Sequence, residues 1–155
     1  MTYKEVGSRE RDIQRILDAH RFAVLATQRG GQPHTSLVAY TPLDGIRQLA
    51  FATYRSTRKF KSLLENHQVA LFIGGQAASS HEVGERTLLT AHGMALEVSP
   101  DEKARVSHEH QMRHPDLQTF LSSPEAALVL VDVTAYQLVN DIEDVHWFHL
   151  TDVPA

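Results

Sequence analysis

The sequence contains no cysteine, which excludes disulfide bonds, thiolate metal sites and cysteine nucleophiles. It also has no apolar run near the roughly 20 residues that a membrane-spanning helix requires. The first twelve residues are polar and mixed in charge, so they lack the apolar stretch of a secretory signal peptide. We therefore expect a cytoplasmic protein without a membrane partner. With 155 residues, one domain spanning 1–155 can bury enough core to fold without covalent cross-links.

Several catalytic and nucleotide-binding motifs are absent as well. The sequence has no Gly-x-Ser-x-Gly nucleophile elbow, which argues against a hydrolase with a Ser-His-Asp triad. It has neither a Gly-x-Gly-x-x-Gly fingerprint nor a P-loop, so dinucleotide-binding Rossmann domains and nucleoside triphosphatases are excluded.

Basic residues are missing from the C-terminal part of the chain. All fifteen Lys and Arg lie at or before Arg113, beside twelve Asp and Glu, whereas the last 42 residues hold seven acidic side chains. The net charge of -4 and the lack of further basic clusters argue against a nucleic-acid partner. Four basic residues nevertheless fall between Arg55 and Lys61, a local concentration that favours the binding of one anion.

The hydrophobic pattern predicts a mainly β protein of the α+β class with peripheral helices. Apolar residues at helical spacing predict helices over residues 8–20, 57–66 and 99–113. Short apolar or alternating runs predict strands over residues 22–27, 34–41, 49–53, 69–73, 87–98 and 127–139, with a last strand over 145–150. The Gly-, Ala- and Ser-rich segment 74–84 is expected to be a loop. Six or so antiparallel strands favour a closed or nearly closed barrel, because closure removes exposed strand edges.

Two of the predicted helices begin in contrasting ways. Ser99-Pro-Asp-Glu102 follows the rules for a helix N-terminus and predicts a capping box. The helix after Ser56-Thr57 instead carries Arg58 and Lys59 in its first turn, where cations oppose the helix dipole. Free amides, hydroxyls and two cations together favour a phosphate site. The alternative is that these charges only keep a short surface helix hydrated.

The residues around this helix resemble a known family. Ala26-Thr27 is followed by Gly31-Gln-Pro-His34 and the strand Thr35 to Tyr40, and then by Phe51-Ala-Thr53, Ser56-Thr-Arg-Lys59 and Leu63-Leu-Glu-Asn66. In this order and spacing the motifs resemble the pyridoxamine 5'-phosphate oxidase-like family of FMN-binding split barrels. They cover about a third of the chain.

The resemblance implies a six-stranded antiparallel split β-barrel of Greek-key topology that forms a homodimer, with FMN at the subunit interface. It implies a flavoprotein, and we expect an oxidoreductase acting on an unidentified small-molecule substrate. By position, the phosphate lies near Thr53 and is held by Thr57, Arg58 and Lys59. The ring lies along the strand 36–41. The implied cofactor-binding residues are therefore Ser36, Leu37, Val38, Ala39, Thr41, Thr53, Thr57, Arg58 and Lys59.

The sequence also departs from that family. Ser36 and Thr41 stand where relatives often carry an arginine and a lysine, which predicts fewer contacts to the cofactor. The C-terminal segment contains no arginine for a phosphorylated substrate, so oxidation of pyridoxamine phosphate itself is not expected. Some relatives bind a deazaflavin or haem in place of FMN. A non-catalytic carrier or sensor of flavin, deazaflavin or haem is the alternative function.

Ten histidines raise the question of a metal site. His110 and His114 form an i, i+4 pair beside His108, but Met112 stands where a zincin motif needs its second histidine. We therefore expect a hydrated helix face and no metal. His146 and His149 flank Trp147 and Phe148, which favours an ordinary aromatic cluster at a strand end. Tyr54 follows Thr53 closely enough to border the cofactor, or to be a packed strand-end residue.

Overall fold

The computed structural model describes residues 1–74 and 87–153, and all statements about structure concern these two segments. The elements are, in chain order, α1 (Tyr3–Ala19), β1 (Phe22–Arg29), β2 (Gln32–Leu43), β3 (Gln48–Tyr54), α2 (Arg58–Glu65), β4 (Gln68–Ile73), β5 (Leu88–Glu97), α3 (Pro100–Arg113), η2 (Pro115–Leu117), α4 (Gln118–Leu121), β6 (Ala126–Asp141), β7 (Asp144–His149) and η3 (Leu150–Asp152). Apart from Gly74, the loop expected at 74–84 lies outside the described residues. None of the described helices has both the length and the apolar character needed to cross a membrane.

Six strands close into a barrel in the order β3-β2-β1-β4-β5-β6, and β6 pairs back to β3. Because β4 returns to lie beside β1, the first four strands form a Greek key. Strand β5 occupies one edge of β6. The other edge is divided, with residues 126–132 pairing with β3 and residues 135–141 pairing with β7. The predicted six-stranded antiparallel split barrel is confirmed, and the predicted last strand, β7, extends the same sheet.

Alternation along the strands sends one set of side chains into the barrel. In β1, Ala23 and Leu25 are buried, whereas their neighbours Phe22 and Val24 are each 38% exposed on the outer face. Two tyrosines are fully buried with their hydroxyls satisfied. Tyr40 donates to the Leu17 carbonyl at 2.8 Å, and Tyr136 donates to the Ile46 carbonyl at 2.6 Å. Burial raises the pKa of both hydroxyls, so they remain neutral donors.

The N-termini of two helices differ from prediction, one in its position and the other in its cap. Helix α1 begins at Tyr3, five residues before the predicted start at Ser8, because Thr2 and Glu5 form a reciprocal capping box. The capping box predicted at Ser99 is wrong, since that side chain makes no capping hydrogen bond. Glu102 instead pairs with Arg105 at 2.6 Å, so the carboxylate needed for the box is engaged one turn further along the helix.

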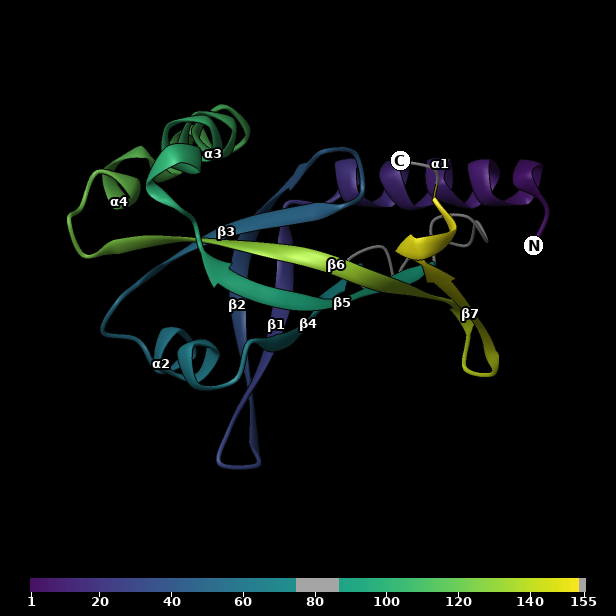
Figure 1. Ribbon diagram of the computed structural model, residues 1–155, viewed down its shortest axis with the longest axis horizontal. Coiled ribbons are helices and arrows are strands. Elements are labelled where there is room, and N and C mark those ends of the chain that lie inside the picture. Colours follow the sequence, from purple (N-terminus) through teal and green to yellow (C-terminus); the bar gives the residue numbers. More distant parts are fainter. Residues whose placement is uncertain (75–86, 154–155) are drawn as a thin grey trace.

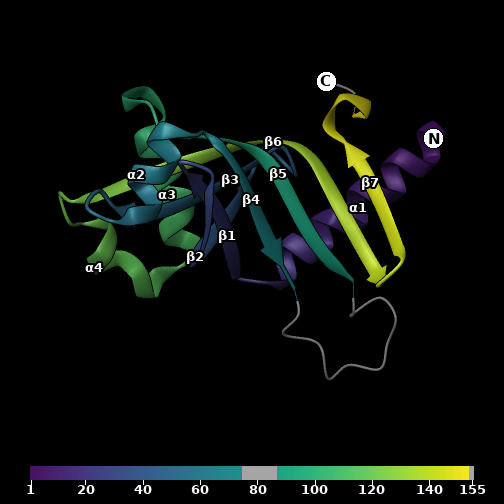
Figure 2. The same ribbon diagram turned by 90° about the horizontal axis from the view of Figure 1, so that it is seen from below.

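The connections between strands place three helices together. Helix α2 lies between β3 and β4 in the chain, whereas α3 and α4 lie between β5 and β6. Figures 1 and 2 show all three at the same end of the molecule, away from β7. This arrangement brings side chains that are more than 60 positions apart in sequence, such as Thr41 and His110, to the same wall of the barrel.

Candidate functional site

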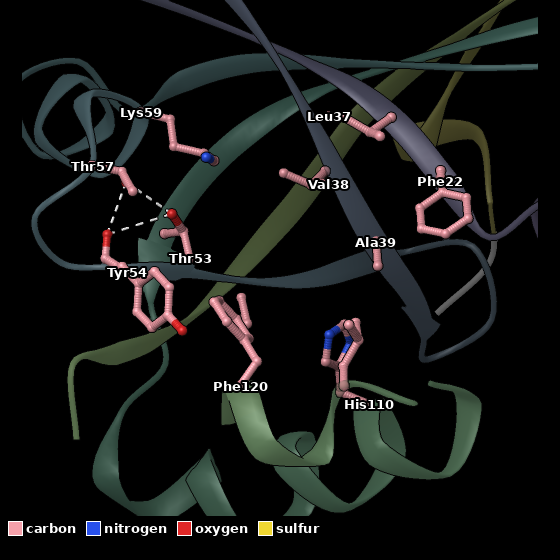
Figure 3. Close-up of a pocket in the computed structure, with 12 residues that line it drawn as sticks. Phe22, Leu37, Val38, Ala39, Thr53, Tyr54, Thr57, Lys59, His110 and Phe120 are labelled. Carbon is pink, nitrogen blue, oxygen red and sulfur yellow. Dashed lines mark hydrogen bonds between the residues drawn. The ribbon is translucent and has the colours of Figure 1, made fainter. Parts of the chain in front are cut away.

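Thr57 is the N-cap residue of α2. The Thr57 hydroxyl accepts from the Phe60 amide at 3.3 Å and donates to the Tyr54 carbonyl at 2.8 Å. The Thr53 hydroxyl, at the end of β3, lies 2.8 Å from that of Thr57 (Figure 3). Two hydroxyls therefore meet at the positive end of the α2 dipole.

The first turn of α2 carries Arg58 and Lys59 and no acidic residue. Across residues 1–74 and 87–153, neither cation has an ion-pair or hydrogen-bond partner. The nearby Arg55 behaves differently, because it pairs with Glu97 and lies over the Phe60 ring at 5.6 Å from the centroid. Two charges thus remain unneutralised at an end of the helix where only an anion would be stabilised.

A pocket of about 260 Å³ opens beside this entrance. Strands β2 and β3 form one wall, and α3, η2 and α4 form the other (Figure 3). Thr53, Thr57 and Lys59 lie at one end, while apolar side chains make up most of the remainder. The rings of Tyr54 and Phe120 close one side in an edge-to-face contact, with centroids 4.5 Å apart. The lining residues are Phe22, Leu37, Val38, Ala39, Ala52, Thr53, Tyr54, Thr57, Lys59, His110, Leu117 and Phe120.

The structure gathers most of the predicted cofactor-binding residues here, namely Leu37, Val38, Ala39, Thr53, Thr57 and Lys59. The other predicted residues do not line the pocket. Arg58 is exposed beside Lys59 at the polar end. Ser36 is half-buried on β2 and pairs with Leu25. Thr41 is buried and bonded to His110.

Sequence reasoning did not identify the wall formed by α3, η2 and α4. Leu117, Phe120 and His110 come from that wall, and Phe22 and Ala52 come from the strands opposite. The burial of His110 could have been inferred from its spacing. It lies four residues after Val106 and therefore shares a helix face with that buried valine. Leu117 and Phe120 lie in elements of three and four residues, too short to show a periodicity.

The expectation of a hydrated helix face for the α3 histidines is wrong for two of them. His108 is exposed, but His110 is 1% exposed and His114 is fully buried. The end of α3 turns this face against β2, and the two imidazoles pack with ring centroids 4.9 Å apart. Burial lowers the pKa of His110 to about 4, and the positive charges of Arg113 and of His114 in its protonated form lower it further.

His114 is held in one neutral tautomer. Its Nε2–H donates to the Tyr40 carbonyl at 2.7 Å, which leaves Nδ1 to accept from Arg21 at 3.3 Å. Burial lowers the pKa of His114. Arg113 anchors the same region by donating to the carbonyls of Leu17, His20 and Tyr40. The end of α3 is therefore fixed to β2, to the last turn of α1 and to the segment that follows it.

The other histidines discussed above lie away from the pocket. His146 pairs with Asp144 at 2.7 Å on the surface of β7. His149 stacks on Trp147, with centroids 6.2 Å apart, so the predicted aromatic cluster at this strand end is present. Among residues 1–74 and 87–153, no group of three or more His, Asp or Glu side chains is arranged to hold a metal ion.

Comparison with known proteins identifies the family of the chain. The family model for pyridoxamine 5'-phosphate oxidase matches residues 10–140, which is most of the chain. The chain belongs to the pyridoxamine 5'-phosphate oxidase family. It matches no curated protein. The resemblance seen in the α2 motif and the preceding strands is therefore confirmed.

Solved structures of this fold carry different functional names. A haem-binding protein from Mycobacterium smegmatis has a TM-score of 0.80 at 17% identity, covering 92% of this chain and 58% of that one. General Stress Protein 26 from Bacillus anthracis has a TM-score of 0.71 at 17% identity, with 92% and 98% covered. The haem storage protein HutZ from Vibrio cholerae has a TM-score of 0.68 at 18% identity, with 80% and 89% covered. At such identities these neighbours establish the fold alone. The chain spans little more than half the length of the first of them.

Proposed function

We propose that this protein binds FMN in the pocket and acts as a flavin-dependent oxidoreductase on a small molecule. The observation that carries the proposal is the pair of cations, Arg58 and Lys59, which have no partner in the part of the chain that the structure describes and lie at a helix N-terminus that opens into an apolar pocket. A ligand with an apolar ring system at one end and a dianionic phosphate at the other fits that polarity. Cationic side chains, hydroxyls and helix amides are the groups that bind phosphate in proteins.

Separate groups of residues bind the phosphate and the ring of FMN. Thr53 and Thr57 offer hydroxyls, and Arg58 and Lys59 offer charge, to the phosphate. Leu37, Val38 and Ala39 on β2 offer an apolar wall and backbone groups to the ring. Bound FMN supplies two-electron chemistry, while the protein controls orientation and access. Because none of the described residues along the apolar wall is an exposed acid or base, we favour hydride exchange over proton abstraction.

The direct test is the visible spectrum of the purified protein after addition of FMN and gel filtration. We expect the flavin bands to elute with the protein, and NADH or NADPH followed by oxygen or a dye to turn the bound flavin over. A protein that retains no FMN would contradict the binding proposal. Retention without turnover would contradict only the enzymatic part and leave a carrier or sensor.

We further propose that two copies of the chain form a homodimer that completes the pocket. Val24 pairs with Leu37 on one side and Phe72 on the other, so these side chains form an apolar row across β2, β1 and β4. They are 38%, 67% and 40% exposed. Leu37 also lines the pocket, as does Phe22. A second copy that covers this row would therefore also cover one side of the pocket.

The Leu37→Asp substitution is expected to shift the protein from dimer to monomer, because it places a charge at the most exposed position of the apolar row. Sedimentation velocity measures the shift. Leu96→Asp, at a comparably exposed leucine on β5, is the matched control. A wild-type protein that sediments as a monomer at micromolar concentration would contradict the dimer.

A non-catalytic protein that binds flavin, deazaflavin or haem is the second candidate. Two structural neighbours are described as haem-binding or haem storage proteins. The buried His110 gives this candidate local support, because a neutral imidazole is the form that ligates a metal. Titration with haemin distinguishes the candidates. Haem retained after gel filtration in preference to FMN would favour this function.

A further inference from the structure

His110 has a buried nitrogen without a partner. Its Nδ1 lies 2.7 Å from the Thr41 hydroxyl, whereas its Nε2 is buried and makes no hydrogen bond. Leaving a buried polar group unpaired is costly, and such groups in native proteins call for an explanation. The side chain is 1% exposed, so bulk solvent does not provide one.

The surrounding protein groups are already engaged. His114 uses both ring nitrogens, on the Tyr40 carbonyl and on Arg21, and Arg113 donates to three backbone carbonyls. The His110 ring forms part of the pocket lining, and Figure 3 shows it rising from α3 toward β2, between Phe120 and Ala39. Among residues 1–74 and 87–153 no group hydrogen-bonds to Nε2, and because the His110 ring belongs to the pocket lining, a molecule in the pocket is a candidate partner.

We propose that His110 is a ligand-binding residue, whose Nε2 hydrogen-bonds to the ring edge of the bound flavin, and that Thr41 is the positioning residue that orients it. The inference rests on the proposed function. An isoalloxazine edge offers both donors and acceptors, so it suits either neutral tautomer of the imidazole. In this arrangement Thr41 contributes to cofactor binding indirectly, by orienting His110. This explains why Thr41, which was predicted to bind the cofactor, does not line the pocket.

Two substitutions separate the two ring nitrogens. Asparagine at 110 keeps a polar group near the position of Nδ1 and removes Nε2, whereas glutamine places its amide near the position of Nε2. We expect His110→Asn to weaken FMN and riboflavin binding alike, by about tenfold, and His110→Gln to restore most of the loss. His108→Asn, at the exposed histidine on the same helix, should bind both flavins as the wild type does.

Thr41→Val tests the positioning role without changing the volume of the side chain much. It should weaken binding about threefold in the presence of His110 and have no further effect in the His110→Asn background. Binding is measured by quenching of flavin fluorescence, with folding of each variant checked by thermal unfolding. If the His110→Asn variant does not fold, the test rests on the Thr41→Val variant. Wild-type flavin affinity in the Thr41→Val variant then overturns the inference.

The outcomes also separate this inference from the proposed function. Wild-type protein that binds neither FMN nor riboflavin contradicts the proposed function itself. Wild-type binding that His110→Asn leaves unchanged overturns only the role of His110. Equal losses of flavin affinity in His110→Asn and His110→Gln also overturn the role of His110. They would indicate disturbed packing and no specific contact through Nε2.

Discussion

Replacing Arg58 and Lys59 together with alanine is expected to weaken FMN binding by about a hundredfold or more and to leave riboflavin binding nearly unchanged. Each hydrogen bond to a charged group contributes about 1.5–3 kcal/mol, and two such losses correspond to at least a hundredfold in Kd. Riboflavin lacks the phosphate, so its contacts with the apolar wall of the pocket survive. The two cations have no partner among the described residues, so their removal breaks no internal ion pair.

Calorimetric titration of both flavins at fixed salt measures the difference, since phosphate contacts are screened as ionic strength rises. The matched control is Lys61→Ala with Lys103→Ala, which removes the same charge from exposed positions outside the pocket lining. Equal losses of FMN and riboflavin affinity in the Arg58 and Lys59 variant would place the phosphate elsewhere. His110→Asn has the opposite signature, because it should affect both flavins to the same degree.

Acidification from about pH 6.5 to pH 4 is expected to lower the free energy of unfolding by about 3 kcal/mol through His110 alone. Burial lowers the pKa of the native imidazole from 6.5 to about 4, so in this interval the unfolded chain binds a proton that the native chain does not. The stabilisation is complete above pH 6.5 and is lost as the pH falls toward 4. His114, whose pKa burial also lowers, adds to the loss.

Urea unfolding at a series of pH values measures this slope. The groups near His110 are Thr41, His114 and Arg113, and of these His114 is the other imidazole whose pKa burial lowers. Asp116, whose pKa is lowered chiefly by a hydrogen bond from its own backbone amide and by Arg21, loses its contribution below about pH 4, outside the histidine interval. His110→Asn should flatten the slope, and His108→Asn should not. A wild-type slope that persists in His110→Asn would contradict the assigned burial.

Much of the fold could be predicted from the sequence, because the patterns that indicate its strands and turns each involve only a few consecutive residues. The strands at 49–53 and 69–73 show short apolar runs, and turn residues such as Gly30 and Gly31 adopt the positive φ that a tight hairpin requires. Helix ends were less predictable. The capping box formed at Thr2 and not at Ser99, because a carboxylate that can cap a helix can equally well pair with an arginine one turn away.

By itself, the sequence determined the barrel strands, the capped entrance of α2 and the two cations that oppose its dipole, since these depend on residues close together in the chain. Only the tertiary structure decided the second wall of the pocket and the burial of His110 and His114. Their environment depends on how α3 packs against β2, from which three strands, β3, β4 and β5, separate it in the chain. A helix of mixed polarity does not reveal which of its polar side chains face a neighbour, because long-range packing determines which face is buried.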